Sequence, residues 1–198
     1  MLARTLRAEA LAPGARVLDV CTGSGLLAVT AALCGARATA VDVSRRAVVC
    51  AALNARLNGV RVRALRGDLL EPVRGERFDA IVSNPPYLPA ADDGLPGRGA
   101  ARAWDAGRDG RAILDRLCAQ APDHLAPGGV ILLIHSALCG TDATLEALRR
   151  SGLTGEVVER HRGALGPLLR ARAPQLEARG LLAPGQRDEE VVVVRGVA

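Results

Sequence analysis

The sequence contains no lysine: its 26 basic residues are all arginine, set against 21 acidic residues. The resulting net charge of +5 permits an anionic partner such as a nucleic acid. However, the arginines are spread from Arg4 to Arg195 without a dense run. That distribution favours a solvated basic surface over a dedicated nucleic-acid-binding segment.

Aromatic residues are almost as scarce, with one Phe, one Tyr and one Trp. The core must therefore be built from Ala, Val, Leu and Ile. A hydrophobic content of 49% excludes wholesale disorder. At 198 residues the chain is large enough to bury a core, and we expect one domain spanning residues 1–198.

The five cysteines include no Cys-x-x-Cys pair and no histidine at ligand spacing, so we predict no metal site. We expect small, reduced core side chains and a cytoplasmic protein. Residues 20–36 carry no charge, but this stretch of 17 residues is shorter than the ~20 that a membrane span needs. Arg4, Arg7 and Glu9 interrupt any N-terminal signal peptide. We therefore expect no membrane association.

Short apolar runs alternate with longer helical patterns along the chain. The predicted strands are 15–20, 37–44, 60–65, 77–83, 129–135, 157–160 and 189–195, and the predicted helices are 24–35, 44–59, 109–124 and 141–152, with Ser44 and Thr141 as helix caps. Such alternation predicts an α/β fold, a doubly wound and mostly parallel sheet of seven strands with helices on both faces. The run Val191–Val194 has no polar alternation, so we place it inside the sheet.

One connection breaks the short-loop rule. Residues 88–107 lack periodicity and are rich in Gly and Pro. Loops of that length in a compact domain are usually functional or disordered. Because this loop follows an Asn-Pro-Pro-Tyr segment, we interpret it as a lid or substrate-recognition loop.

A glycine-rich turn, Thr22-Gly23-Ser24-Gly25, joins the first predicted strand to the first predicted helix. Residues 23–28 match the dinucleotide fingerprint G-x-G-x-x-A, so an NAD site must be considered. Asp19 ends the strand just before the turn, where it would repel a pyrophosphate but attract an ammonium. S-adenosylmethionine carries an ammonium and a sulfonium and no phosphate. Asp19 therefore favours S-adenosylmethionine.

Two further acids follow the next two strands. Asp42 is placed to accept the ribose hydroxyls, and Asp68 to accept the adenine amino group with Leu69 packed on the ring. Each acid alone would be interpreted as a helix cap or turn residue, but three at successive strand ends indicate a nucleoside ligand. The predicted cofactor-binding set is Asp19, Cys21, Thr22, Gly23, Gly25, Asp42, Val43, Asp68, Leu69 and Asn84.

The predicted catalytic set is Asn84, Pro85, Pro86 and Tyr87, directly after the fourth strand. The prolines restrict the backbone, so the Asn84 side-chain oxygen and the Pro85 carbonyl are held at a set separation. Two fixed acceptors match a planar NH2 group, and Tyr87 can lie against its face. Holding both hydrogens stabilises positive charge on the nitrogen during attack on a methyl group. The alternative is a rigid structural turn.

With these motifs in view, the chain resembles class I S-adenosylmethionine-dependent methyltransferases, and more closely the HemK/PrmC family of protein-glutamine N5-methyltransferases. The resemblance rests on DVCTGSG, VDVS, GDLLEP, SNPPYLP and AWDAGRDGRAILDRL. It implies a Rossmann-like fold with an antiparallel last strand. The implied substrate is the glutamine of a Gly-Gly-Gln segment in translation release factors.

Two departures from the family pattern stand out. Cys21 replaces a glycine that is often found two residues after the acid. The first predicted strand starts by Ala15, so the chain resembles the short branch that lacks an N-terminal helical domain. For that branch the resemblance implies a small zinc-binding activator subunit, and substrates that extend to lysine and DNA adenine.

Other candidates are weaker. Trp104, Asp109 and Arg111 either shape a substrate channel or anchor the loop and cap the next helix. His124, His135 and His161 lack partners at useful spacing, so we interpret them as structural. Three alternatives remain open: an adenine-N6 methyltransferase on DNA or RNA, a small-molecule N-methyltransferase, and a non-catalytic cofactor-binding module. The absence of a separate nucleic-acid-recognition domain disfavours the first, and the intact NPPY segment disfavours the last.

Overall fold

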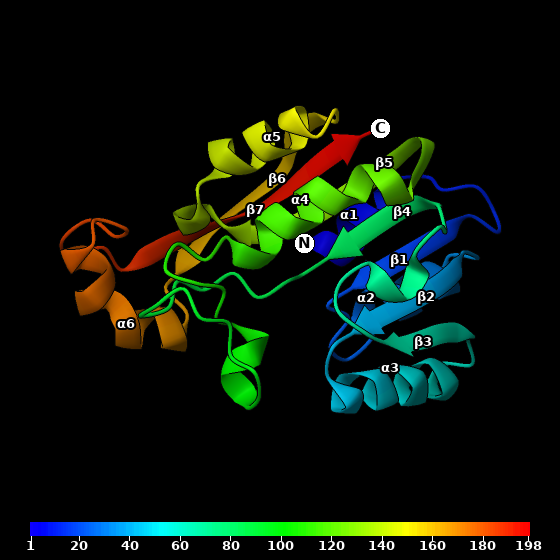
Figure 1. Cartoon of the computed structure of the whole chain (residues 1–198), viewed down its shortest axis with the longest axis horizontal. Coiled ribbons are helices and arrows are strands. Elements are labelled where there is room, and N and C mark those ends of the chain that lie inside the picture. The colour runs from blue at the N-terminus through cyan, green and yellow to red at the C-terminus, as the bar shows by residue number, and fades with distance from the viewer.

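The computed structural model describes residues 1–198, which form a three-layer α/β fold (Figure 1). Its strands are β1 (Arg16–Val20), β2 (Arg37–Asp42), β3 (Val62–Arg66), β4 (Phe78–Ser83), β5 (Leu125–Ser136), β6 (Thr154–Ala164) and β7 (Asp188–Val197). Its helices are α1 (Leu2–Ala8), α2 (Leu26–Leu33), α3 (Arg45–Leu57), α4 (Ala112–His124), α5 (Thr141–Arg150) and α6 (Pro167–Ala178), with short 3-10 turns η1 (Glu71–Val73), η2 (Ala100–Ala103) and η3 (Ala137–Cys139). The seven predicted strands and the four predicted helices are confirmed.

The seven strands form one sheet in the order β3-β2-β1-β4-β5-β7-β6. β1 through β5 pair in parallel, and β7 pairs antiparallel with both β5 and β6. The order reverses between β1 and β4, which is the point where open α/β sheets bind ligands beyond their carboxyl ends. The doubly wound sheet and its antiparallel last strand are therefore confirmed.

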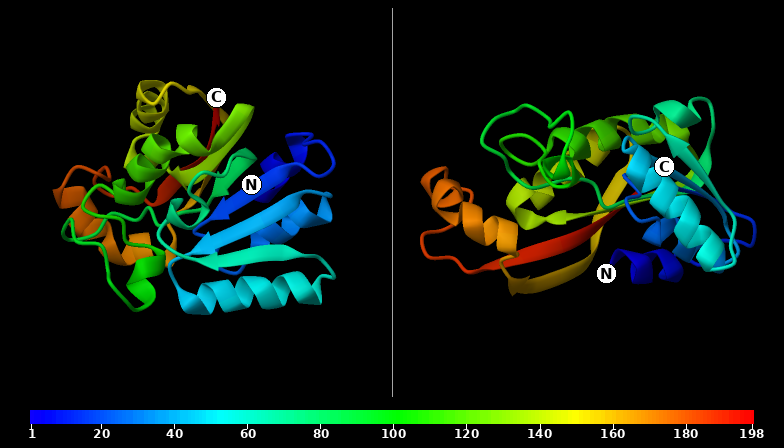
Figure 2. Two further views of the ribbon diagram at one scale, coloured as in Figure 1. Left: turned by 45° about the vertical axis from the view of Figure 1, so that its right-hand side comes forward. Right: turned by 90° about the horizontal axis from the view of Figure 1, so that it is seen from below.

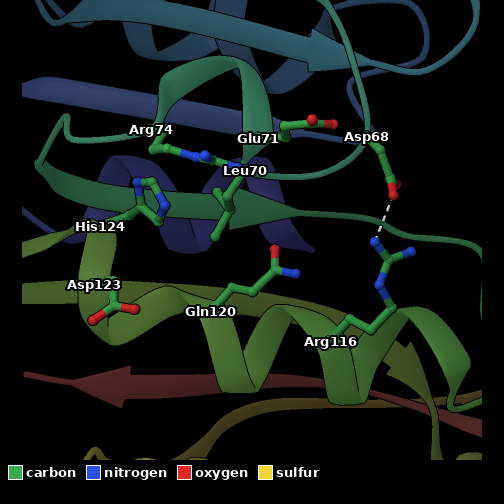
Figure 3. Close-up of a pocket in the computed structure, with 8 residues that line it drawn as sticks. All are labelled: Asp68, Leu70, Glu71, Arg74, Arg116, Gln120, Asp123 and His124. Atoms are coloured by element: carbon green, nitrogen blue, oxygen red, sulfur yellow. Dashed lines mark hydrogen bonds and ion pairs between the residues drawn. The ribbon is translucent and has the colours of Figure 1, made fainter.

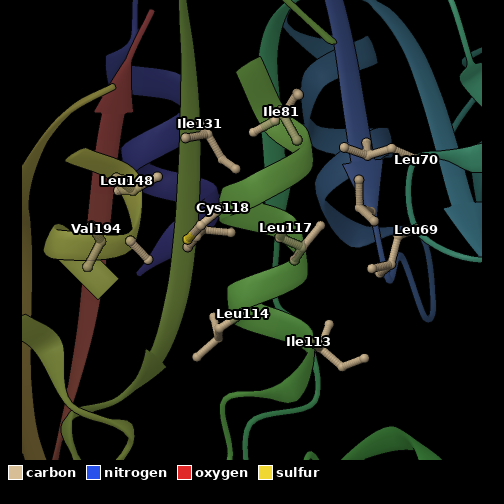
Figure 4. Packing of buried hydrophobic residues seen from close by; sticks show 14 of the residues in the cluster. Leu69, Leu70, Ile81, Ile113, Leu114, Leu117, Cys118, Ile131, Leu148 and Val194 are labelled. Carbon is tan, nitrogen blue, oxygen red and sulfur yellow. The ribbon is translucent and has the colours of Figure 1, made fainter. Parts of the chain in front are cut away.

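The main core consists of two apolar layers, one on each face of the sheet, and a smaller third cluster lies around α6. In β1, Val17 belongs to the layer under α1, α2 and α3, whereas the next residue, Leu18, belongs to the layer under α4 and α5. Figure 4 shows α4 and the larger layer, with Leu114 and Cys118 facing β5 and β7. β7 contributes Val193 to one layer and Val192 and Val194 to the other, all fully buried. The prediction that the valine run lies inside the sheet is confirmed.

Several elements differ from the sequence-based expectation. α6 was missed because Pro167 and Pro174 make the segment read as non-helical, although Pro167 sits at the permitted first turn. The seven-residue α1 was missed because its apolar pattern is short. β6 extends well beyond the predicted 157–160, because it pairs with β7 along its full length. Thr141 is not the cap of α5; Gly140 is.

The cysteine expectation holds for two of the five residues. Cys118 and Cys139 are buried core side chains, whereas Cys34 and Cys50 are exposed and Cys21 is half-buried. All five are free thiols.

None of the helices is long and apolar enough to cross a membrane.

Candidate active site

The glycine turn lies between β1 and α2 and is fastened to β2. The Thr22 amide donates to the Val41 carbonyl at 3.1 Å, and the Gly23 amide donates to Asp42 Oδ2 at 3.0 Å. A side chain at Gly25 would lie 2.8 Å from the Ala51 backbone, so Gly25 lets α2 pack against α3. Gly23 is exposed, and no atom lies within 4 Å of where its Cβ would be. The turn therefore leaves open space above Gly23.

Cys21 occupies this turn in a left-handed conformation, with φ of 57°. A residue with a side chain is strained there, whereas glycine adopts that conformation freely. Burial, followed by the charges of Asp42 and Asp19, raises the pKa of the Cys21 thiol to about 12. The thiol is therefore neutral, and we assign it no nucleophilic role. Cys21 in place of the family glycine therefore introduces strain into the loop.

Asp19 is fully buried in β1, one residue before the strand ends. Its Oδ2 accepts from Thr22 Oγ1 at 2.6 Å and from the Ala28 amide at 2.9 Å, so one oxygen caps the first turn of α2. Its Oδ1 is buried without any hydrogen-bond partner. Burial raises the pKa of this carboxyl to about 7, and Asp42 adds a smaller repulsive contribution. A cationic donor near Oδ1 would relieve both penalties.

Asp42 ends β2 and is half-buried. Its Oδ1 accepts from the Ser44 amide at 2.8 Å, while its Oδ2 holds Gly23. Each carboxylate oxygen retains capacity for a further donor, so hydroxyl groups can still bind. Val43, also half-buried, follows directly and begins the connection to α3.

The structure places Asp68 and Leu69 differently from the sequence prediction. Asp68 is exposed and forms an ion pair with Arg116 of α4 at 2.5 Å (Figure 3). Leu69 is 4% exposed and packs in the core, with a left-handed φ of 49°. Leu69 therefore faces the core rather than an open ring site. A cleft of about 300 Å³ begins at Asp68 and runs along α4, lined by Leu70, Glu71, Arg74, Arg116, Gln120, Asp123 and His124.

Asn84 follows β4 at the carboxyl edge of the sheet and is exposed. β4 pairs with β1 so that Ser83 lies opposite Val20, which brings Asn84 next to the glycine turn. The buried Ser83 hydroxyl donates to the Val20 carbonyl at 2.6 Å and ties the two strand ends together. The Asn84 amide itself has no protein partner. Its hydrogen-bonding capacity is therefore unused within the protein.

Tyr87 is half-buried and packs against the larger core layer. Burial raises the pKa of its phenol to about 12, so the ring is neutral. Its carbonyl accepts from Cys139 Sγ at 2.9 Å. Pro85 is buried and Pro86 is half-buried.

The 88–107 loop is folded back on itself. The Leu88 amide donates to the Trp104 carbonyl at 2.7 Å, and the Ala106 amide donates to the Leu88 carbonyl at 3.1 Å. Trp104 is 40% exposed. Asp109 Oδ1 accepts from the Arg111 amide at 2.9 Å, which supports its interpretation as a turn residue before α4.

The histidines do not converge on this site. His135 is fully buried in β5 with Nδ1 2.9 Å from the Ser136 carbonyl, and burial lowers its pKa. His124 lies at the far end of α4, and His161 in β6. No three His, Cys, Asp or Glu side chains come together in a way that could hold a metal ion.

Four residues of the site region were not predicted to contribute to it: Ser83, Gly110, Arg116 and Cys139. Ser83 was readable as a polar residue at a buried strand end. The other three act through long-range contacts, which no local pattern marks. Arg111, named only as a weak candidate, turns out to be 9% exposed and hydrogen-bonded from its guanidinium.

The arrangement fits S-adenosylmethionine better than a dinucleotide. The partnerless Asp19 Oδ1 suits an ammonium, Asp42 suits ribose hydroxyls, and the open Gly23 permits close approach. Acidic groups at this edge would repel a pyrophosphate. The strand order with its antiparallel β7, together with this site, defines a class I S-adenosylmethionine-dependent methyltransferase.

Comparison with known proteins narrows the class to a family. The family model "Methyltransferase small domain" matches residues 1–94. A Methanocaldococcus jannaschii protein, provisionally named a protein N5-glutamine methyltransferase, is 39% identical over 145 residues, covering 73% of each chain. The chain thus belongs to the protein N5-glutamine methyltransferase family.

Other relatives carry more specific names. A release factor glutamine methyltransferase of Bordetella pertussis is 42% identical, over 70% of this chain and 53% of its own. A ribosomal protein uL3 glutamine methyltransferase of Bradyrhizobium diazoefficiens is 43% identical, over 59% of this chain and 39% of its own. The chain spans about half or less of these two bacterial relatives.

Among solved structures, the Encephalitozoon cuniculi Mtq2-Trm112 complex, responsible for methylation of the termination factor eRF1, aligns with a TM-score of 0.62. The sequence identity is 21%, over 99% of this chain and 92% of that one. This likeness supports the fold.

Proposed function

We propose that this chain methylates the side-chain nitrogen of a glutamine in a protein of the translation machinery, with a release-factor Gly-Gly-Gln segment as the first candidate. Family membership supports the reaction, and the names of the relatives support the substrate class. Such a substrate is made in the cytoplasm, where we place this protein as well.

The observation that carries the proposal is the unpartnered Asn84 amide beside the glycine turn. Its oxygen and the Pro85 carbonyl are the two acceptors that can hold the hydrogens of a glutamine NH2. This grip orients the nitrogen and stabilises the positive charge that develops on it. Tyr87, neutral and next to this pair, can cover the flat face of the amide.

The remaining roles belong to the cofactor side. When bound, S-adenosylmethionine supplies a methyl group on a positively charged sulfur. Asp19 would hold its ammonium and Asp42 its ribose hydroxyls. Asp68 would accept the adenine amino group through Oδ1, because Arg116 pairs with its Oδ2. The chain thus contributes binding and orientation, and no strong base is required because the amide proton becomes acidic once the nitrogen is alkylated.

Replacement of Asn84 tests the proposal. We expect Asn84→Ala to lower methyl transfer to a release factor by about 100-fold or more, the usual scale for a lost transition-state hydrogen bond. Cofactor affinity should stay within about threefold, because Asp19 and Asp42 supply the charged contacts to the cofactor and Asn84 acts mainly on the substrate. The matched control is Asn58→Ala, an exposed asparagine at the end of α3. Radiolabelled transfer and calorimetry give the two readings.

Mass spectrometry of the labelled product locates the methyl group. Label on the Gly-Gly-Gln glutamine supports the proposal, and label on uL3 instead keeps the chemistry but changes the substrate. Label on RNA or on a small molecule would contradict it. So would an Asn84→Ala enzyme of wild-type activity, or one in which cofactor affinity falls as much as the rate.

We also propose a small zinc-binding activator subunit, as in the short branch of the family. The edge formed by β3 and α3 supports it. β3 is a terminal strand with an unpaired side, and α3 exposes Val49, Leu53 and Leu57, spaced four residues apart, at 60%, 54% and 73%. Exposed apolar rows of this kind mark interaction surfaces.

The charge of this edge specifies the partner further. Residues 37–66, from β2 through β3, hold seven arginines and one acid, a net charge of +6. The chain as a whole has +5, so the rest carries −1. The arginines that look dispersed in sequence thus include a concentrated basic edge. An activator that binds here should present apolar side chains flanked by acids.

A further inference from the structure

The backbone directly after the catalytic asparagine is held by a distant thiol. Cys139, at the end of η3, places its Sγ 2.9 Å from the Tyr87 carbonyl, although the two residues are 52 positions apart. Cys139 is 3% exposed and belongs to the core. A buried thiol aimed at a carbonyl is a hydrogen-bond donor as long as it stays protonated.

The surroundings of Cys139 keep it protonated. Burial raises the pKa of its thiol to about 12, despite the nearby Arg111, which acts in the opposite direction. The thiol therefore remains an S–H donor throughout the physiological pH range, and it is a poor candidate for redox chemistry.

Arg111 holds the backbone of Cys139 in place. Its Nη1 donates to the Cys139 carbonyl at 2.6 Å, to the Gly140 carbonyl at 3.1 Å and to Thr144 Oγ1 at 3.1 Å. Its Nη2 pairs with Asp115 of α4 at 2.5 Å. Because this guanidinium is almost buried, its hydrogen bonds hold η3 and α5 in place against the start of α4.

Gly110 closes the arrangement sterically. Its φ is +74°, and a Cβ at this position would lie 2.3 Å from the Tyr87 carbonyl oxygen and 2.9 Å from Cys139 Sγ. Any side chain would push the Tyr87 backbone away from its donor. Gly110 thus permits the thiol–carbonyl contact.

The opposite end of the segment is tied as well, because the Ser83 hydroxyl holds the Val20 carbonyl at 2.6 Å. Between the two ties lie the exposed Asn84 and the buried Pro85. We propose that Cys139, supported by Arg111 and accommodated by Gly110, is a positioning residue that sets the direction of these acceptors and of the Tyr87 ring. This inference rests on the proposed role of Asn84.

Cysteine substitutions test the donor. We expect Cys139→Ala to lower kcat for glutamine methylation about tenfold or more, because misplacement by a fraction of an ångström is costly to a near-attack geometry. The Kd for S-adenosylhomocysteine should stay within about twofold, since the glycine turn is untouched. Cys139→Ser keeps a donor and should recover kcat to within about threefold of wild type. The control is Cys118→Ala, another fully buried thiol of the same core layer, for which kcat should stay within about twofold.

Glycine substitutions test the steric part. Gly110→Ala should lower kcat by at least as much as Cys139→Ala. Gly152→Ala has a similar positive φ of +84° but nothing within 4 Å of its Cβ, so it introduces backbone strain alone. Thermal melts of all variants separate folding from positioning. A Gly152→Ala enzyme with wild-type kcat and a similar loss of stability would assign the Gly110 effect to the contact.

The outcomes distinguish this inference from the proposed function. If Asn84→Ala is inactive but Cys139→Ala and Cys118→Ala have the same kcat, the positioning role is wrong and the catalytic role stands. Failure of Cys139→Ser to recover kcat would also overturn the donor role. If Asn84→Ala is fully active, the catalytic role itself is wrong.

Discussion

At the residue scale, the two carboxylate oxygens of Asp19 lie in different situations. Its Oδ2 completes the first turn of α2 by accepting from the Ala28 amide, and its Oδ1 is left buried without a partner. A structural cap alone does not need the second oxygen in such a place. The protein tolerates the cost by holding the group partly protonated, with a pKa near 7.

This raised pKa predicts how cofactor affinity depends on pH. Only the ionised form of Asp19 attracts an ammonium, so affinity should fall as pH drops below about 7. We expect the Kd for S-adenosylhomocysteine to rise up to about tenfold per pH unit over that range. Asp19→Asn should flatten the profile. Calorimetry between about pH 5.5 and 7, checked by circular dichroism, provides the measurement, and a wild-type profile as flat as that of the variant would contradict the assignment.

The same shift has a stability consequence of opposite direction. Between the ordinary aspartate pKa of 3.8 and the raised pKa of about 7, the folded chain binds a proton at Asp19 that the unfolded chain has lost. The contribution of this residue to the free energy of unfolding therefore decreases as pH rises through that window. Bound cofactor should offset the loss, because its ammonium favours the ionised form.

At the element scale, α6 holds the 88–107 loop through two arginines. Arg172 lies 2.7 Å from Asp105 and donates to the Pro89 carbonyl at 2.9 Å. Arg179 donates to the Ala90 carbonyl at 2.7 Å and to the Arg108 carbonyl. The loop next to the NPPY segment is thus held in place by contacts with α6. The sequence pattern did not predict that helix.

Removing one of these contacts should make the 88–107 loop more mobile. We expect Arg172→Ala to speed amide exchange at Leu88, Ala90 and Ala106 about tenfold, since a lost charge-assisted hydrogen bond is worth roughly 1.5 kcal/mol or more. Arg170→Ala is the control, because Arg170 bonds only to Leu165 just before its own helix. Hydrogen-exchange mass spectrometry resolves the segment. Unchanged exchange in Arg172→Ala would mean that the loop holds itself through its own backbone bonds.

At the scale of the whole molecule, the basic β3 edge and the NPPY segment lie in different places. Figures 1 and 2 show α3 running along the β3 edge, while α6 lies at the opposite end of the domain. The NPPY segment follows β4 near the middle of the sheet. A partner on the basic β3 edge can therefore bind without covering the substrate side of Asn84.

This separation yields a test of the activator proposal. Tagged chain purified from its host should bring down a small zinc protein in equal amount. Leu53→Glu should abolish that association, because it replaces an apolar contact with a negative charge that repels the acidic groups of the partner. Leu168→Glu is the control, since Leu168 is exposed at 39% on α6. Mass spectrometry and zinc analysis identify the partner. Association that survives Leu53→Glu would place the subunit elsewhere.

The sequence alone determined what local chemistry can carry. The strand–helix alternation predicted the sheet, the Ser44 cap predicted the start of α3, and the NPPY segment predicted a rigid pair of acceptors, because each depends on neighbours within a few residues. Tertiary structure alone decided which distant groups meet. Pairing with β7 set the length of β6, and α4 turned Arg116 onto Asp68. Chain folding also brought Cys139 to the Tyr87 carbonyl. Such contacts form between residues dozens of positions apart, and at that separation the spacing in the sequence does not indicate the distance in space.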